Sequence, residues 1–202
     1  MELAVSAHSA GALVDVKSAS RLGRGDFGQN RRNITELLAA VSVELMDEKP
    51  PRGYEGLLFC HFTDHPFEKV APLFFDSDFL PVISPPWLKV KILDKPDPVR
   101  VGARMRINVA DMFTWEVQFV EWNPPRAFTD RQTSGPFDEF IHRHTFAKKA
   151  GGCVVCDRLH YKYKFGALGK FAGQTLTGAR LAAMLADRGR RLDEYLEREG
   201  RQ

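Results

Sequence analysis

Three runs of sequence between Phe128 and Gly169 decide the fold: FTDRQTSG (128–135), PFDEFIHRHTFAKKA (136–150) and CVVCDRLHYKYKFGALG (153–169). Each run alternates apolar and polar residues with the period of a β-strand, and tight turns join the runs. The alternation puts polar side chains among core residues on one face, namely Asp130, Gln132, His142, His144, Asp157 and Tyr161 beside Phe128, Phe140, Phe146 and Leu159. A face of this composition predicts the lining of a pocket.

The register of these strands follows from the turns between them. If Ala150-Gly151 is a two-residue hairpin loop, Lys149 pairs with Gly152. Each residue before Lys149 then pairs with the residue that lies equally far after Gly152. A three-residue loop around Gly135-Pro136 and a two-residue turn at Pro124-Pro125 extend the count to two further strands. The predicted pairs are His144 with Asp157, His142 with Leu159, Phe140 with Tyr161, Asp130 with His142, Gln132 with Phe140, Phe119 with Asp130 and Val117 with Gln132. Each histidine therefore has a carboxylate across the strand, and the inner face continues to Trp115 and Phe113.

Composition indicates a soluble globular chain. The 202 residues are 44% hydrophobic, which is enough for one core with an appendage. No apolar run approaches the roughly 18 to 20 residues of a membrane span, and no secretory signal is recognisable. The net charge of +3 is too small and too scattered to predict a nucleic-acid partner. Three cysteines argue against a disulfide framework, and we expect a cytoplasmic protein.

The chain divides near Pro50-Pro51. Residues 1–50 are predicted to be an extension that is mostly mobile, because residues 1–32 offer little that forms a core. Apolar residues at helical spacing predict one short amphipathic helix at about 34–47. Its apolar stripe would dock on the main domain or on a second copy of the chain, so a homodimer is one expectation.

Residues 51–202 are predicted to form one domain. A first strand at 57–63 is followed by two short helices, with prolines between them, up to Pro85-Pro86. Six strands follow at about 88–94, 100–110, 112–122, 126–134, 137–149 and 152–164. A long amphipathic helix spans about 168–199.

This order of elements is that of the helix-grip fold, and several local spellings resemble one superfamily. They are Pro85-Pro86-Trp87-Leu88, Asn123-Pro124-Pro125-Arg126-Ala127-Phe128, Gly135-Pro136-Phe137, His142-Arg143-His144-Thr145-Phe146 and Phe165-Gly166-Ala167-Leu168-Gly169. From about 55 to 197 the chain resembles the SRPBCC superfamily, which includes START lipid-transfer domains and polyketide cyclases, and within it the bacterial proteins labelled cell-division-inhibitor-like. The resemblance implies an α+β fold in which a curved antiparallel sheet of about seven strands grips the terminal helix. It also implies a cavity for an apolar small molecule between sheet and helix.

The histidine pair admits three interpretations. His142 and His144 lie on one strand face, so with Asp130 or Asp157 they have the residue types of a two-histidine, one-carboxylate metal site. A simple structural pairing of each histidine with its carboxylate is the preferred alternative, and no metal or cofactor is expected. The third interpretation is acid–base chemistry on a bound ketone, with His142, His144 and Asp157 as the candidate catalytic residues and Tyr161 as a donor to the oxyanion.

Other candidates receive structural interpretations. Cys153 and Cys156 are three apart on a strand and point to opposite faces, so they cannot share a metal. His61 is expected to face outward or to cap the neighbouring helix. The cluster Arg188, Arg190 and Arg191 is expected to be a solvated, salt-bridged helix face.

The sequence thus predicts a helix-grip protein that binds a hydrophobic or amphipathic small molecule in a central cavity. The expected contact residues are Trp115, Phe128, Asp130, Gln132, Phe140, His142, His144, Asp157 and Tyr161. A cyclase or dehydrase using a His–Asp pair and a regulatory, partner-binding protein are the alternatives. The size of the cavity is the discriminating observation, since several hundred cubic ångströms would favour ligand binding or catalysis and a filled core would favour regulation.

Overall fold

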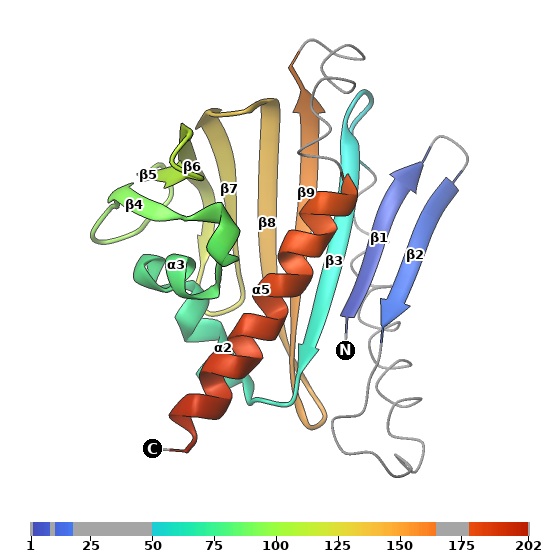
Figure 1. The fold of residues 1–202 in the computed structure, drawn as a ribbon, viewed down its shortest axis with the longest axis vertical. Coiled ribbons are helices and arrows are strands. Elements are labelled where there is room, and N and C mark those ends of the chain that lie inside the picture. The colour runs from blue at the N-terminus through green and yellow to red at the C-terminus, as the bar shows by residue number, and fades with distance from the viewer. Residues whose placement is uncertain (1, 9–10, 18–49, 165–177, 202) are drawn as a thin grey trace.

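The fold is one antiparallel sheet covered on its inner face by helices (Figure 1). The computed structural model describes residues 2–8, 11–17, 50–164 and 178–201. The predicted helix at 34–47, and the first part of the predicted terminal helix, lie outside these residues.

The described strands form a nine-stranded sheet in the order β2-β1-β3-β9-β8-β7-β6-β5-β4. Neighbouring strands in this order pair antiparallel throughout. The bounds are Glu2–His8 (β1), Gly11–Lys17 (β2), Glu55–Thr63 (β3), Lys91–Asp94 (β4), Arg104–Val109 (β5), Phe113–Asn123 (β6), Ala127–Ser134 (β7), Phe137–Lys149 (β8) and Gly152–Tyr163 (β9). The seven strands predicted from the sequence are confirmed, and they correspond to β3 to β9.

The hairpin β1–β2 was not foreseen from the sequence. β1 pairs with β2 and β3, so residues 2–8 and 11–17 extend the sheet beyond the seven-stranded unit. From the sequence we expected an extension that is mostly mobile and named no strand in residues 1–32. Their composition had suggested no core, but main-chain pairing to an edge strand needs little apolar content.

Helical segments cover the inner face. Between β3 and β4 lie α2 (Phe67–Phe74) and α3 (Leu80–Ile83), with short 3₁₀ turns at Ser77–Phe79 and Pro86–Leu88. The C-terminal α5 (Gly178–Glu199) crosses the sheet obliquely and contacts β3 and α3 (Figure 1). The predicted helix-grip fold is confirmed. None of the described helices is long and apolar enough to span a bilayer.

Two hydrophobic clusters hold α5 and the short helices to the sheet. In the first, Leu181 and Leu185 of α5 pack with Leu57, Phe59 and Leu159 of the sheet. In the second, the short helices and the end of α5 pack against the aromatic side chains of β6–β8, with Val70, Phe79, Leu192, Phe128 and Phe146 as members. The apolar stripe of α5 therefore faces the sheet along the described length of the helix.

The predicted register is confirmed in the last hairpin. Gly151 adopts a positive φ of 77° in the two-residue loop, and Lys149 pairs with Gly152. The resulting pairs include His144–Asp157, His142–Leu159, Phe140–Tyr161 and Asp130–His142. Local turn geometry was sufficient to place these residues because the strand period is two.

The β6–β7 turn is one residue longer than predicted. Asn123 pairs with Ala127, which leaves three residues in the loop. A bulge between Phe119 and Glu121 absorbs the extra residue, so Phe119 still faces Asp130. The predicted pairs Phe119–Asp130 and Val117–Gln132 are thus confirmed, with a different turn.

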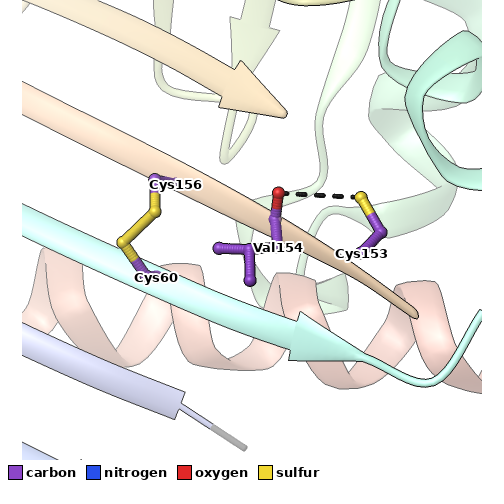
Figure 2. Close-up of a disulfide and its surroundings, with 4 residues drawn as sticks. All are labelled: Cys60, Cys153, Val154 and Cys156. Atoms are coloured by element: carbon purple, nitrogen blue, oxygen red, sulfur yellow. Dashed lines mark hydrogen bonds between the residues drawn. A yellow bond between two sulfur atoms is a disulfide. The ribbon is translucent and has the colours of Figure 1, made fainter. Parts of the chain in front are cut away.

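Cys60 and Cys156 form a disulfide between β3 and β9 (Figure 2). This corrects the expectation that the cysteines stay unpaired. The two residues are direct partners across the strands although 96 positions separate them in sequence. Cys153 lies apart with its thiol toward the Val154 carbonyl, and burial raises its pKa to about 12. Cys153 and Cys156 do not converge, as the strand period predicted.

His61 is also placed differently from the prediction. It is buried, and its Nε2 lies 3.2 Å from Oδ2 of Asp193 on α5. Gly189 of the same helix lies directly over the imidazole, since a Cβ on Gly189 would stand 2.7 Å from His61 Cγ. His61 therefore faces the helix and not the solvent.

Candidate functional site

A cavity of about 160 Å³ lies between the sheet, the short helices and α5. It is smaller than the several hundred cubic ångströms set as the mark of a large ligand pocket, yet it is not a filled core. Most of its wall is apolar and comes from α2 to Leu88, from β5 to β8 and from Met184 of α5. The polar side chains in the wall are Asp76, Ser77, Ser84, Asp130, His142, His144 and Arg188.

Six of the nine residues predicted to contact a ligand line this cavity. They are Trp115, Phe128, Asp130, Phe140, His142 and His144. β6, β7 and β8 present them because alternate residues of each strand face inward. Phe128 stacks on the His144 ring with the ring centroids 4.2 Å apart, so the aromatic wall and the polar end are in contact.

The other three predicted residues do not line the cavity. Gln132 donates from Nε2 to the Phe137 carbonyl at 2.8 Å and so closes the β7–β8 turn. Tyr161 belongs to the cluster beneath Leu181, and burial, with Tyr163 beside it, raises the pKa of its hydroxyl far above the usual value. Asp157 lies behind the two histidines.

Asp157 is the centre of the polar cluster. Its Oδ1 accepts a hydrogen bond from His142 Nε2 at 2.9 Å and lies 2.8 Å from His144 Nδ1. Asp130 approaches the other side of His144, with Oδ2 3.6 Å from Nε2. Both histidines thus share Asp157, whereas the sequence had assigned a separate carboxylate to each. His142 reaches Asp157 although its Cα partner on β9 is Leu159. The direction of the side chains, which the strand register does not specify, produces this diagonal contact.

The two histidines have opposite protonation preferences. Burial, reinforced by the neighbouring His144, lowers the pKa of His142. Burial also opposes charge on His144, but contacts with Asp130 and Asp157 outweigh it and raise the pKa of His144. Burial favours the protonated form of Asp157, yet the two imidazoles hold its pKa well below the usual range. These shifts favour the neutral form of His142, the protonated form of His144 and the carboxylate form of Asp157.

Arg188 is the polar residue that the sequence analysis misplaced. Its side chain is only 12% exposed, lines the cavity and brings Nη1 to 3.6 Å from Asp157 Oδ1. Arg190 and Arg191 do form the predicted surface pairs with Asp187. The signal for Arg188 was present in the sequence, because it lies three residues after Leu185 and four before Leu192 on the apolar stripe.

One group of described side chains has the composition of a metal site. Asp130, His142 and His144 each offer a ligand atom, and these atoms lie within 4.8 Å of one another. Asp157 contacts one ring nitrogen of each histidine, Nε2 of His142 and Nδ1 of His144, which leaves the other ring nitrogen of each for a ligand. A metal at this group would have to displace the proton that the raised pKa of His144 favours, because an imidazolium cannot donate a lone pair.

The family is shown by a match over most of the domain. Residues 64–185 match the family described as polyketide cyclase / dehydrase and lipid transport. The chain belongs to this family. Residues 1–41 match a different model, a family of proteins of unknown function called DUF1499. No curated protein matches the chain in sequence.

Solved structures share the fold at low sequence identity. Protein Ms6760 from Mycobacterium smegmatis is 17% identical with a TM-score of 0.53, over 71% of this chain and 92% of that one. Protein NE0264 from Nitrosomonas europaea is 12% identical with a TM-score of 0.55, over 73% and 97%. The di-domain ARO/CYC StfQ from the steffimycin biosynthetic pathway is 16% identical with a TM-score of 0.56, over 88% and 63%. Identities at this level show the fold alone.

Proposed function

We propose that the protein binds a small hydrophobic or amphipathic molecule in the central cavity, as a carrier or a sensor. The observation that supports this proposal is an apolar cavity with polar groups gathered at Asp130, His142, His144 and Arg188. Apolar walls supply affinity through burial, while a few fixed polar groups orient the ligand. Membership of a family whose description includes lipid transport agrees with this function.

A thermal-shift and calorimetric screen with flat polycyclic compounds and short fatty acids tests the proposal. A ligand at a hundredfold excess over its dissociation constant should add about 2.7 kcal/mol to the unfolding free energy. The matched variants are Val117→Phe and Val120→Phe, both on β6. Val117 lines the cavity, whereas the side chain of Val120 is exposed.

Val117→Phe should abolish binding because it fills the cavity, and Val120→Phe should leave binding unchanged. Binding that survives Val117→Phe would place the ligand elsewhere. A screen in which nothing shifts the wild-type melting temperature would refute the proposal. Native mass spectrometry of the freshly purified protein adds a direct search for a co-purifying molecule.

A second candidate function is acid–base catalysis of the cyclase or dehydrase type. The observation that favours it is the opposite protonation preference of two adjacent histidines that both line the cavity. Neutral His142 has the state of a general base, and imidazolium His144 has the state of a general acid. Tyr161 lies outside the wall, so the oxyanion donor expected at that position has to come from another residue.

One variant distinguishes the binding function from the catalytic function. Replacing His142 by Gln should abolish turnover of a true substrate while leaving ligand affinity within about tenfold if the site is catalytic. A pure binding protein would show no turnover to lose. The regulatory alternative depends on the predicted helix at 34–47, which lies outside the described residues.

A further inference from the structure

Three buried side-chain nitrogens of the cavity wall make no hydrogen bond within the described part of the chain: Nδ1 of His144, Nε1 of Trp115 and Nη1 of Arg188. His144 Nδ1 lies 2.8 Å from Asp157 Oδ1, so Trp115 and Arg188 supply the two N–H donors that have no close acceptor. The indole comes from β6 and the guanidinium from α5. Buried donors of this kind usually meet an acceptor, because leaving one without a partner forfeits its hydration.

Asp157 does not satisfy Arg188. Its Oδ1 is 3.6 Å from Nη1, outside hydrogen-bond range, and the same oxygen already contacts both histidines at 2.9 and 2.8 Å. A guanidinium has five N–H groups and no acceptor, so Arg188 retains donors for another group. The wall itself contains two carboxylates, Asp76 and Asp130. Asp130 is paired with His144, whose Nε2 lies 3.6 Å from Asp130 Oδ2.

Building on the ligand-binding function proposed above, we propose that the ligand is an apolar carboxylic acid whose carboxylate accepts hydrogen bonds from Arg188 and Trp115. A carboxylate matches the planar fork of a guanidinium, and hydrogen bonds between charged partners are the strongest available. The cavity volume of about 160 Å³ limits the apolar body to one or two rings, or to a short chain. Phe128 and Phe140 supply flat aromatic surface for that body.

Three probes of one shape test the proposal by calorimetry with the full chain. They are 2-naphthoate, 2-acetylnaphthalene and 2-ethylnaphthalene, which carry a carboxylate, a neutral carbonyl and no acceptor. We expect 2-naphthoate to bind at least about tenfold more tightly than 2-acetylnaphthalene, and 2-ethylnaphthalene to bind most weakly.

Variants locate the effect. Arg188→Gln should remove the preference for 2-naphthoate while 2-ethylnaphthalene still binds, and that residual binding shows that the variant is folded. Trp115→Phe keeps a ring but removes the indole N–H, so it should weaken 2-naphthoate several-fold. Arg190→Gln is the matched control, since Arg190 is exposed on the same helix, and it should change nothing.

The outcomes distinguish this inference from the ligand-binding function. Equal affinities for all three probes would overturn the carboxylate while upholding a binding cavity. A preference for 2-acetylnaphthalene would overturn the carboxylate in favour of a neutral acceptor. A carboxylate preference that survives Arg188→Gln would overturn the role of Arg188. If no probe binds and Val117→Phe and wild type behave alike, both proposals fail.

Discussion

Two buried groups of side chains pair histidine with a carboxylate where α5 meets the sheet, and they differ in what they face. We call His142, His144, Asp157 and Arg188 the site cluster, and His61 with Asp193 the helix contact. The histidines and the arginine of the site cluster line the cavity. At the helix contact, Gly189 lies so close to His61 that the helix backbone covers the ring.

This difference teaches that burial and ion pairing do not by themselves identify a functional histidine. Both contacts have side chains at most 12% exposed, and both join a strand to α5. Only the site cluster combines two histidines of opposite protonation preference with a wall that a small molecule can reach. We therefore propose that the site cluster recognises the ligand and that the helix contact docks α5.

The largest expected effect is that of removing the charge at the centre of the site cluster. Asp157→Asn leaves Arg188 and the His144 imidazolium without their shared carboxylate, and breaking a buried pair in this way costs about 3–5 kcal/mol. Urea denaturation measures the loss. Glu121→Gln is the control, because its pair with Arg143 is about one-third exposed and should be worth at most about 1 kcal/mol. Equal losses would remove the distinction between buried and surface pairs here.

A second substitution addresses the helix contact. Gly189→Ala places a Cβ 2.7 Å from the His61 ring, so either the helix or the ring must shift. We expect a loss of about 1–3 kcal/mol of unfolding free energy, although alanine favours helix formation. Gly200→Ala, just past the end of α5, should change stability by less than about 0.5 kcal/mol.

Ligand binding provides the second readout for Gly189→Ala. If the helix contact only docks α5, probe affinities measured well below the melting temperature should stay within about threefold of wild type. A larger loss would mean that the two contacts are coupled through the helix, and the comparison would then fail.

The pH dependence of stability should differ between the two histidines of the site cluster. For His144 the folded pKa is raised, so its stabilisation is complete below the unfolded value of about 6.5 and is lost as pH rises through the folded value. For His142 the folded pKa is lowered, so the unfolded chain binds the proton more tightly and stability falls as pH drops below about 6.5. Together they predict a stability maximum near that pH.

Single variants test separately the fall in stability above the pH of the maximum and the fall below it. His144→Gln should flatten the alkaline limb and His142→Gln the acidic limb down to the region where carboxylates titrate. NMR titration of Asp157→Asn should show a lowered pKa for His144, because a neutral amide no longer favours the imidazolium. A His144 pKa that does not move would contradict the contact between His144 Nδ1 and Asp157 Oδ1 as the source of the shift.

The smallest expected effect concerns metal. We expect elemental analysis to find no stoichiometric zinc or iron, and added zinc to change ligand affinity by less than about twofold at neutral pH. The reason is that the contacts of His144 with two carboxylates favour its protonated form. Metal in proportion to protein, lost in His142→Ala, would instead make Asp130, His142 and His144 a metal centre.

Much of the site was predictable from the sequence because its determinants are local. A two-residue turn at Ala150-Gly151 and a strand period of two place His144 opposite Asp157 without any knowledge of the remaining chain. Apolar residues at helical spacing similarly predicted the terminal helix, and its stripe already contained Arg188. The spelling of several motifs indicated the helix-grip fold, which the structure confirms.

Other features depend on how distant segments meet, and the sequence alone did not fix them. The disulfide between Cys60 and Cys156 requires the β3–β9 pairing, which joins residues 96 positions apart. The shared carboxylate of Asp157 depends on side-chain directions within a twisted sheet, because strand register fixes Cα partners and not contacts between side-chain tips. The entry of Arg188 into the cavity, and the burial of His61 beneath Gly189, depend on how α5 is rotated and seated on the sheet. The sequence by itself thus determined the strands, their register and the inward face, whereas tertiary packing decided which charged groups share a cavity.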